Sequence, residues 1–287
     1  MNYVLSKQDE QRWQKLKKQQ LPDAEALLRS QEIRCMNACS RFINRDSLKY
    51  KAWSLNDKKG RVSALIILSK QSVLPVLCDQ DSIPPPAFLR GFPGKVHLHS
   101  IQGCKHDALM LETTLGKTGL FAAETIDYDV MSIDQPPSDY LSAGPAGLVI
   151  RKPQLADMNA LAVLHAAYEQ EEVLPAASVF NAAVSRLNIE RIFAKEHMVI
   201  AELNGRIIGK INTNAVTFTR YQVGGVYVLP DYRGLGIARR MAGEFTASLT
   251  ARGRGISLFV KKSNPAARRV YQRIGYALNG DYRISYY

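Results

Sequence analysis

Apolar and polar positions follow the clearest pattern in the second half of the chain. GLVIRKP predicts a short strand, and LADMNALAVLHAAYEQEEV carries apolar side chains at helical spacing. A second helical pattern covers about residues 177–194. HMVIAELNGRIIGKINTNAV then contains two β-rich runs joined by Asn204-Gly205, a dipeptide that tolerates positive φ in a hairpin turn. YQVGGVYVLP follows as a third strand.

A long helix is predicted directly after Gly236. It carries one apolar stripe, formed by Ile237, Met241, Phe245 and Leu249. ISLFV predicts another strand. SNPAARRVYQRIGY predicts a helix capped by Ser263 or Asn264, and YRISYY is a closing strand. The order β-α-α-β-β-β-α-β-α-β predicts a mixed α/β sheet domain.

The first half has a less explicit pattern. Helical stretches are expected at about residues 8–18 and 23–42, before the hairpin KAWSLNDKKGRVSALIILS. SVLPVLC, KVHLHSI and ETIDYDVMSI predict strands, and HDALMLETTLGK predicts a helix. The proline- and glycine-rich segment IDQPPSDYLSAGPAG reads as a linker. We therefore expect an N-terminal α/β domain over residues 1–140 and a second domain over residues 146–287.

Composition and charge narrow the class of protein. With 287 residues, 46% of them hydrophobic, the chain is globular. No apolar run approaches the ~18 residues that span a bilayer, and the N-terminus lacks a signal peptide's apolar core. We expect a cytoplasmic protein without a membrane partner. The net charge of +12 favours acidic partners, either nucleic acid or a polyphosphate cofactor, although a solvated basic surface needs no partner. No nucleic-acid-binding motif accompanies the charge, which weighs against nucleic acid.

Potential metal ligands are few. Four cysteines lie in the first 104 residues, and in a reducing compartment they are most simply buried thiols. A second small group contains His97, His99, Cys104 and His106. Neither group has the spacing of a closed zinc site, so we expect no metal.

The stretch VYVLPDYRGLGIARRM, residues 226–241, raises the question of a bound phosphate. Backbone N–H groups at a helix N-terminus attract anions, and glycines let the backbone approach them closely. The stretch has neither the Gly-Lys-Ser/Thr of a Walker A loop nor the third glycine of a dinucleotide fingerprint. Taken alone, its two glycines fit a structural turn and a phosphate loop equally well.

Two motifs together resemble the GNAT superfamily of N-acetyltransferases. Arg233-x-x-Gly236-x-Ala238 matches that family's Arg/Gln-x-x-Gly-x-Gly/Ala signature. The segment from Asn264 through Tyr271 to Gly275-Tyr276 is similar to its second motif. The resemblance covers about residues 147–287 and implies the GNAT acyl-CoA N-acyltransferase fold.

The resemblance also implies roles for individual residues. The strand segment Val226, Tyr227 and Val228 would pair with the pantetheine arm of acetyl-CoA, and Asn264 would bond the same region. The pyrophosphate would sit on the backbone amides of Arg233, Gly234, Leu235, Gly236, Ile237, Ala238 and Arg239. Tyr271 would be the general acid for the departing thiolate, the alternative being a core aromatic on a stripe with its helical neighbours.

A base for the acceptor amine is harder to place. No carboxylate lies on residues 222–228, so Glu171 and Glu172 are the next candidates as base or amine anchor, the alternative being solvated helix-end side chains. The segment AYEQEEVLP resembles the corresponding sequence in a bacterial subgroup of this superfamily whose members carry an additional N-terminal domain. From this we hypothesise that the first domain is a degenerate GNAT-like domain that covers the acceptor side or forms a homodimer.

The resulting functional expectation is an acetyl-CoA-dependent N-acetyltransferase that transfers acetyl directly to a primary amine. Acetyl is favoured over longer acyl groups by its frequency in the family. Two alternatives remain, a non-catalytic acyl-CoA-binding or regulatory protein and a modifier of ribosomal or tRNA-bound substrates.

Overall fold

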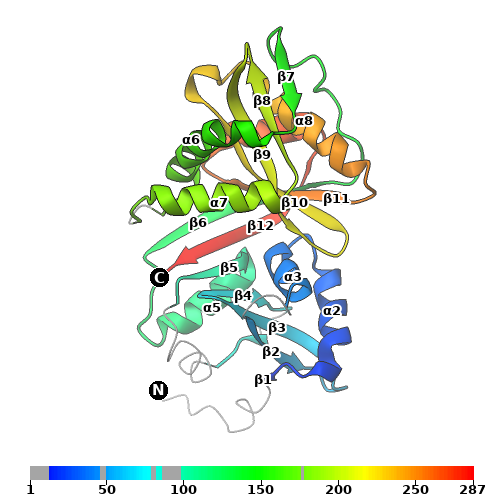
Figure 1. Ribbon diagram of the computed structural model, residues 1–287. Helices are drawn as coiled ribbons and strands as arrows, with labels where there is room; N and C mark the ends of the chain where they lie inside the picture. Colours follow the sequence, from blue (N-terminus) through cyan, green and yellow to red (C-terminus); the bar gives the residue numbers. More distant parts are fainter. Residues whose placement is uncertain (1–12, 46–49, 79–81, 86–97, 176–177) are drawn as a thin grey trace. The chain divides into compact units, whose positions relative to one another are not determined.

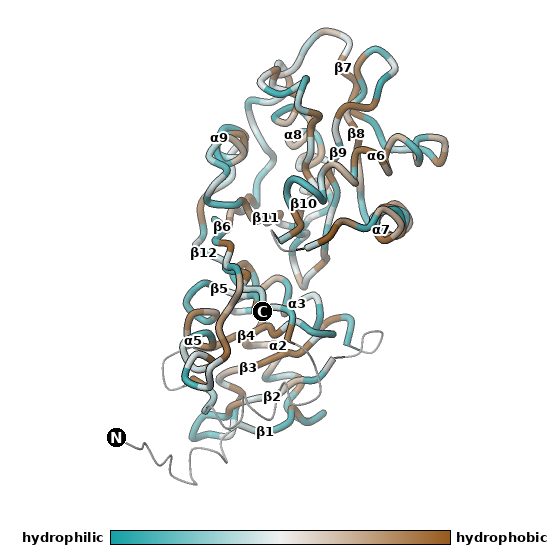
Figure 2. Tube along the Cα trace, turned by 90° about the vertical axis from the view of Figure 1, so that its left-hand side faces the viewer, coloured by the Kyte–Doolittle hydropathy of each residue, from teal (hydrophilic) through white to brown (hydrophobic). Residues whose placement is uncertain are grey.

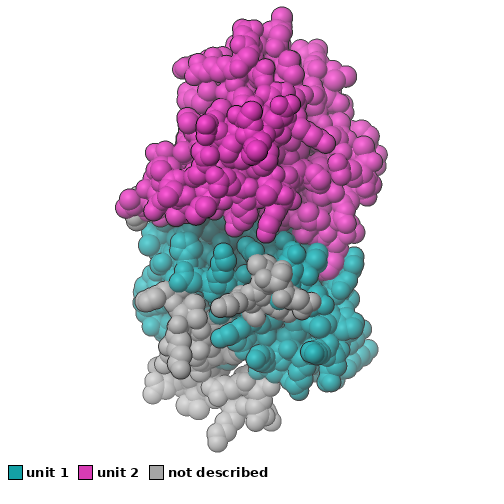
Figure 3. Space-filling view, in the orientation of Figure 1, with its two compact units in different colours: residues 1–129, 280–287 teal, residues 130–279 magenta. Residues whose placement is uncertain are grey.

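A computed structural model describes residues 13–45, 50–78, 82–85, 98–175 and 178–287. The chain forms two compact units (Figure 3): unit 1 contains residues 1–129 and 280–287, and unit 2 contains residues 130–279. These units divide the chain at other places than the expected linker, because the strands β6 (Glu124–Ile133) and β12 (Ala277–Tyr286) each contribute residues to both. No helix in the described ranges is both long enough and apolar enough to cross a membrane.

Unit 1 is an α/β domain (Figure 1). Its sheet order is β1-β2-β3-β4-β5-β12-β6, with β4 and β5 parallel. The further strands are β1 (Trp13–Lys15), β2 (Tyr50–Asn56), β3 (Val62–Ser69), β4 (Ser72–Val76) and β5 (Ser100–Cys104). The helices are α2 (Leu21–Ser30), α3 (Met36–Ile43) and α5 (Lys105–Gly116).

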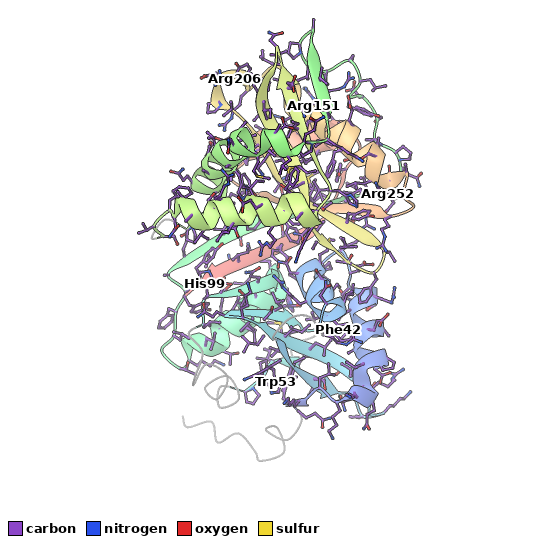
Figure 4. All side chains as sticks on the ribbon, viewed as in Figure 1. Phe42, Trp53, His99, Arg151, Arg206 and Arg252 are labelled. Carbon is purple, nitrogen blue, oxygen red and sulfur yellow. The ribbon has the colours of Figure 1, made fainter. Side chains whose placement is uncertain are left out.

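The first two helical expectations need correction. Trp13–Lys15 is a strand paired antiparallel with β2, and residues 8–12 lie outside the described ranges. The stretch predicted as one helix over residues 23–42 is two helices separated at Gln31 to Cys35. Tertiary contacts outweigh local spacing here: Trp13 pairs with β2 and is 7% exposed, and Phe42 at the end of α3 is 1% exposed. Figure 4 labels Phe42.

Unit 2 has the predicted mixed α/β order. Its sheet order is β12-β6-β11-β10-β9-β8-β7. The strands are β7 (Leu148–Arg151), β8 (Met198–Leu203), β9 (Arg206–Val216), β10 (Arg220–Val228) and β11 (Gly255–Lys261). The helices are α6 (Met158–Tyr168), the π-helical turn η4 (Glu169–Val173), α7 (Ala182–Lys195), the 3₁₀ turn η5 (Pro230–Tyr232), α8 (Ile237–Thr250) and α9 (Pro265–Arg273).

Helices cover both faces of the unit 2 sheet. Figure 2 shows α8 and α9 on one side of the strands and α6 and α7 on the other. The predicted stripe of α8 forms the centre of the core: Ile237, Met241, Phe245 and Leu249 are each at most 2% exposed. Burying such a side chain stabilises the fold by about 1.5–3 kcal/mol. The same stripe therefore fixes where α8 begins, directly after Gly236.

The predicted hairpin is confirmed. Asn204 and Gly205 have φ of +51° and +78°, and Leu203 pairs with Arg206 across the turn. Positive φ at both central positions gives the turn a twist that matches that of the strands it joins. The hairpin places β9 beside β8, and the other edge of β9 pairs with β10, where the candidate site lies.

Candidate functional site

The strands β10 and β11 run side by side for only four residues. Their parallel ladder begins at Arg220 and Gly255 and ends at Val223 and Leu258, although β10 continues to Val228 and β11 to Lys261. Beyond the ladder, β10 stays paired with β9 through Tyr227 and Val228. The edge of β10 that faced β11 therefore carries backbone polar groups that are available to a third, extended partner.

A glycine turn follows this separated strand. Gly234 and Gly236 have φ of +81° and +80°, a left-handed conformation that suits glycine. A Cβ on Gly234 would meet nothing within 4 Å, whereas one on Gly236 would lie 3.0 Å from the Gly144 backbone nitrogen. α8 begins at Ile237 without a side-chain cap, so its first-turn amides point outward beside the positive end of the helix dipole. This arrangement has the chemistry of an anion-binding turn.

The Arg233 side chain is held beside the strand. Its Nε donates to the Val228 carbonyl at 3.0 Å, and its two terminal nitrogens donate to the two oxygens of Glu171 at 2.8 Å each. Tyr227 also donates its hydroxyl to Glu171, at 2.9 Å. Hydrogen bonds from Arg233 and then from Tyr227 lower the pKa of Glu171, so this carboxylate is ionised and fully engaged.

The two arginines after the turn are also paired. Arg239 lies 3.4 Å from Asp139, and Arg240 contacts Glu244 and the Leu141 carbonyl. Their charge is thus partly balanced by unit 2 itself. The backbone amides of the turn, rather than free arginine side chains, are the anion-binding groups that this geometry offers.

Tyr271 lies inside unit 2, on α9. It is 6% exposed, and its ring meets that of Tyr276 edge to face at 5.5 Å. Burial raises the pKa of Tyr271 well above that of an exposed phenol, with a smaller contribution from neighbouring tyrosines and Glu172. Asn264 caps the same helix, because its Oδ1 accepts from the Ala267 amide at 3.0 Å. The cap predicted from sequence is confirmed, and Asn264 orients the helix that carries Tyr271.

Glu171 and Glu172 face different partners although they are adjacent. Glu171 binds Arg233 and Tyr227, whereas the Glu172 carboxylate lies 3.5 Å from Lys261 at the end of β11. Both belong to the π-helical turn η4, in which the backbone is one residue wider per turn than an α-helix. The turn therefore distributes its carboxylates between the ends of the two separated strands.

Sequence reasoning missed Lys210. This residue of β9 is fully buried, and its Nζ donates to the Gly225 carbonyl at 2.8 Å and to Asn212 Oδ1 at 3.2 Å. Nζ also lies 4.3 Å from the centre of the Tyr168 ring. Burial lowers the pKa of Lys210 to about 7, against an opposing effect of Glu169. The pair Gly224-Gly225 within a predicted strand was the only local signal, since glycine there marks a close backbone approach.

His165 completes this polar cluster. It is 3% exposed, and neither ring nitrogen has a hydrogen-bond partner among the described residues, although Nε2 lies 3.3 Å from Glu169. Burial, followed by the charge of Lys210, lowers the pKa of His165 to about 4. Asn188 of α7 donates to Glu169 at 3.0 Å and holds that carboxylate in place.

The other groups of potential ligands do not form a metal site among the described residues. Within the described ranges, no three His, Cys, Asp or Glu side chains come together in a way that could hold a metal. His97 lies outside those ranges, and His99 (Figure 4) packs edge to face on Tyr286 at 5.5 Å. Cys35 and Cys39 are buried thiols 3.5 Å apart, whereas Cys78 is exposed, contrary to expectation.

Comparisons with known proteins point to one family. Residues 163–276 match the family model described as the acetyltransferase (GNAT) family. A GCN5-related N-acetyltransferase from Sphaerobacter thermophilus is 20% identical with a TM-score of 0.62, over 95% of this chain and 94% of that one. A Drosophila protein is 14% identical with a TM-score of 0.64, over 96% and 98% of the two chains. A tandem GNAT protein from the clavulanic acid biosynthesis pathway is 13% identical with a TM-score of 0.57, over 95% and 97%. No curated protein matches the sequence.

The lowered pKa of Lys210 predicts how stability changes with pH. Between pH 7 and the ordinary lysine value of 10.5, the unfolded chain holds a proton that the folded chain has lost, so the wild type gains stability as pH rises. In Lys210→Met this gain is absent. The free energy of unfolding of the variant minus that of the wild type should fall by about 1.4 kcal/mol per pH unit from pH 7.5 to 9.5.

Denaturant unfolding at several pH values measures this difference. Lys195→Met is the matched control, because Lys195 is exposed at the end of α7. Its stability curve should run parallel to that of the wild type. A parallel curve for Lys210→Met as well would contradict the buried, easily deprotonated amine.

Proposed function

We propose that unit 2, in which residues 163–276 match the GNAT acetyltransferase family model, is a GNAT domain that transfers an acetyl group from acetyl-CoA directly to a primary amine. The observation that carries the proposal is the parting of β10 from β11 after Val223 and Leu258, which is followed along the chain by a glycine turn and an uncapped helix. An extended chain that is joined to a pyrophosphate fits a free strand edge that leads into an anion-binding turn. Acetyl-CoA has this composition.

Pantetheine occupies the free edge of β10 in this proposal. Its two amide groups pair with the backbone of Val226, Tyr227 and Val228, as an added strand pairs with a sheet edge. The side chains of Tyr227 and Val228 are buried, so contact with the cofactor falls to the backbone. The arm's thiol end then lies between the separated strands, on the side of α9.

The pyrophosphate lies on the glycine turn. The amides of residues 233–239 donate to its oxygens, and the dipole of α8 adds to the attraction. Gly234 leaves open space above the turn, since a Cβ there meets nothing within 4 Å. The engagement of Arg233 with Glu171 keeps its backbone at a fixed place beside the cofactor.

The chemical step needs a neutral amine and a proton for the leaving thiolate. The amine nitrogen attacks the thioester carbonyl, the carbon–sulfur bond breaks, and the Tyr271 hydroxyl gives its proton to the sulfur. Its raised pKa keeps Tyr271 protonated before the reaction. A thiolate formed in the same buried space is also destabilised and therefore more basic, so the transfer remains feasible. The amine gives up its proton to a carboxylate, which releases it to solvent, and the phenolate takes a proton back from solvent.

Of the two carboxylates, Glu172 is the better candidate for receiving the amine's proton. Both oxygens of Glu171 are taken by Arg233 and Tyr227, which lowers its basicity. Glu172 is close enough to Tyr271 to raise the pKa of its phenol, and its one described ion pair, with Lys261, is 3.5 Å long. We therefore propose that Glu172 accepts the proton of the amine and that Glu171 holds Arg233 and Tyr227 beside the cofactor.

Unit 1 is a degenerate copy of the same fold in this proposal. Its parallel pair β4 and β5, followed by α5, repeats the relation of β10 and β11 followed by α9. However, the sequence between β4 and β5, residues 77–99, is the connection that corresponds to the glycine turn, and it contains no Arg/Gln-x-x-Gly-x-Gly/Ala pattern. One acetyl-CoA should therefore bind per chain.

The phosphate assignment is tested at Gly234. Gly234→Asn keeps the left-handed backbone, which asparagine tolerates, but places a side chain in the open space above the turn. Acetyl-CoA affinity, measured by titration calorimetry, should fall about tenfold or more, equivalent to one lost hydrogen bond to a charged group.

Gly253→Asn is the matched control. Gly253 has φ of +73°, and its Cβ position is equally open, but it lies at the other end of α8. Its affinity should equal that of the wild type. If the wild type, Gly234→Asn and Gly253→Asn bind acetyl-CoA equally well, the phosphate does not bind at the turn. If two acetyl-CoA molecules bind per chain, unit 1 is not degenerate.

The acid role predicts a large loss of turnover in Tyr271→Phe. Thiol release from acetyl-CoA is followed across a panel of primary amines. Removing the phenolic proton should lower kcat about 100-fold at unchanged acetyl-CoA affinity. Tight binding without turnover in the wild type, for every amine, would instead indicate a non-catalytic acyl-CoA-binding protein.

The same assay should distinguish the roles of Glu171 and Glu172. Glu172→Gln should lower kcat about 100-fold, most strongly at low pH where the amine is protonated. Glu171→Gln should instead raise KM for acetyl-CoA up to about fivefold, the range expected for a half-exposed ion pair. If Glu171→Gln lowers kcat and Glu172→Gln raises KM instead, the two roles must be exchanged.

A further inference from the structure

The pairing of β10 with β9 contains a bulge at the point where β10 leaves β11. Gly224 pairs with Asn212 and Tyr227 with Lys210, so Gly225 and Val226 together lie opposite one residue of β9. Gly225 has φ of +59°, and a Cβ on it would lie 2.1 Å from Asn212 Oδ1 and 2.9 Å from Lys210 Nζ. Only glycine fits this position, because Lys210 and Asn212 occupy the space beside it.

The Lys210 side chain holds Gly225 by its carbonyl. This carbonyl accepts a hydrogen bond from Lys210 Nζ at 2.8 Å. The Gly225 carbonyl and the Val226 N–H belong to one planar peptide and point in opposite directions. A contact that fixes the carbonyl therefore also fixes the direction of the Val226 N–H, at the first residue of the segment assigned to pantetheine.

We propose that Lys210 is a positioning residue for the acyl donor: its ammonium group holds the Gly225 carbonyl, and this aims the backbone of β10 at acetyl-CoA. The inference rests on the proposed function, since it assumes that Val226 to Val228 receive the pantetheine arm. Lys210 is fully buried, so it acts through Gly225 and not by touching a ligand.

The groups around Lys210 make this contact sensitive to protonation. Glu169 of η4 and His165 and Tyr168 of α6 face it from the helical side, and Tyr227 is its partner on β10. Glu169 favours the charged form, whereas burial opposes it and brings the pKa to about 7. Below this pH the hydrogen bond to Gly225 is charge-assisted; above it, a neutral amine makes a weaker bond.

Acetyl-CoA affinity at different pH values tests the proposal. Titration calorimetry from pH 6 to 8.5 compares the wild type with Lys210→Met and with Lys195→Met, which also removes one positive charge but from an exposed site. At pH 6, Lys210→Met should bind about tenfold more weakly than Lys195→Met. The ratio should shrink to about twofold at pH 8.5. Ionisation of acetyl-CoA itself is common to all the proteins and cancels in the ratio.

A second variant at the same position removes the charge but keeps a polar side chain. Lys210→Gln carries no positive charge at any pH. At pH 6 it should bind acetyl-CoA more weakly than Lys195→Met, and the ratio should shrink towards pH 8.5. This variant decides the question if Lys210→Met fails to give a cooperative thermal transition. An affinity equal to that of Lys195→Met at pH 6 would overturn the proposal.

The outcomes separate the inference from the function on which it rests. A wild type that does not bind acetyl-CoA rejects the proposed function and the role of Lys210 together. A wild type that binds, with Lys210→Met within twofold of Lys195→Met at pH 6, rejects only the role of Lys210. A tenfold loss that is the same at every pH assigns Lys210 a purely structural role and also rejects the proposal.

Discussion

Two parallel strands that separate halfway along their length impose the main constraint on unit 2. Each backbone amide and carbonyl released by the end of the ladder at Val223 and Leu258 requires a partner or solvent. A sheet would ordinarily close such a gap. Side-chain contacts lie along both separated strands: Lys210 bonds Gly225 in the bulge of β10, Glu171 bonds Arg233 and Tyr227, and Glu172 lies 3.5 Å from Lys261 at the end of β11.

The charged side chains around the glycine turn are largely paired with one another. The chain carries a formal charge of +12, yet the arginines nearest the glycine turn are paired with acidic side chains of unit 2. Attraction for an anion is thus left to backbone amides and the helix dipole, which do not have to reorganise when a ligand arrives. Under the proposed function, fixed dipoles of this kind would select a diphosphate by its geometry, beyond a general preference for acidic partners.

Sequence patterns predicted the features of unit 2 that depend on neighbouring residues. The apolar stripe of α8, the Asn204-Gly205 turn and the Asn264 cap are all local, and each was found where expected. Features created by tertiary proximity were not predictable. Arg233 and Glu171 are 62 positions apart, and the burial of Lys210 depends on Tyr168 and Gly225 approaching from other elements. In unit 1, the strand at Trp13 formed because β2 offered an edge, against the helical spacing of its sequence.

The wide turn η4 gives the site an unusual dependence on chain length. Consecutive α-helical residues are separated by about 100° around the helix axis. Removing one residue from this turn would therefore rotate the side chains before the deletion by about 100° relative to those after it. Glu169, Glu171 and Glu172 now reach His165, Arg233 and Lys261 respectively. A single deletion between Glu169 and Val173 would break this correspondence without removing any of the three partners. In this segment the contacts of the three glutamates depend on the number of residues as much as on their identity.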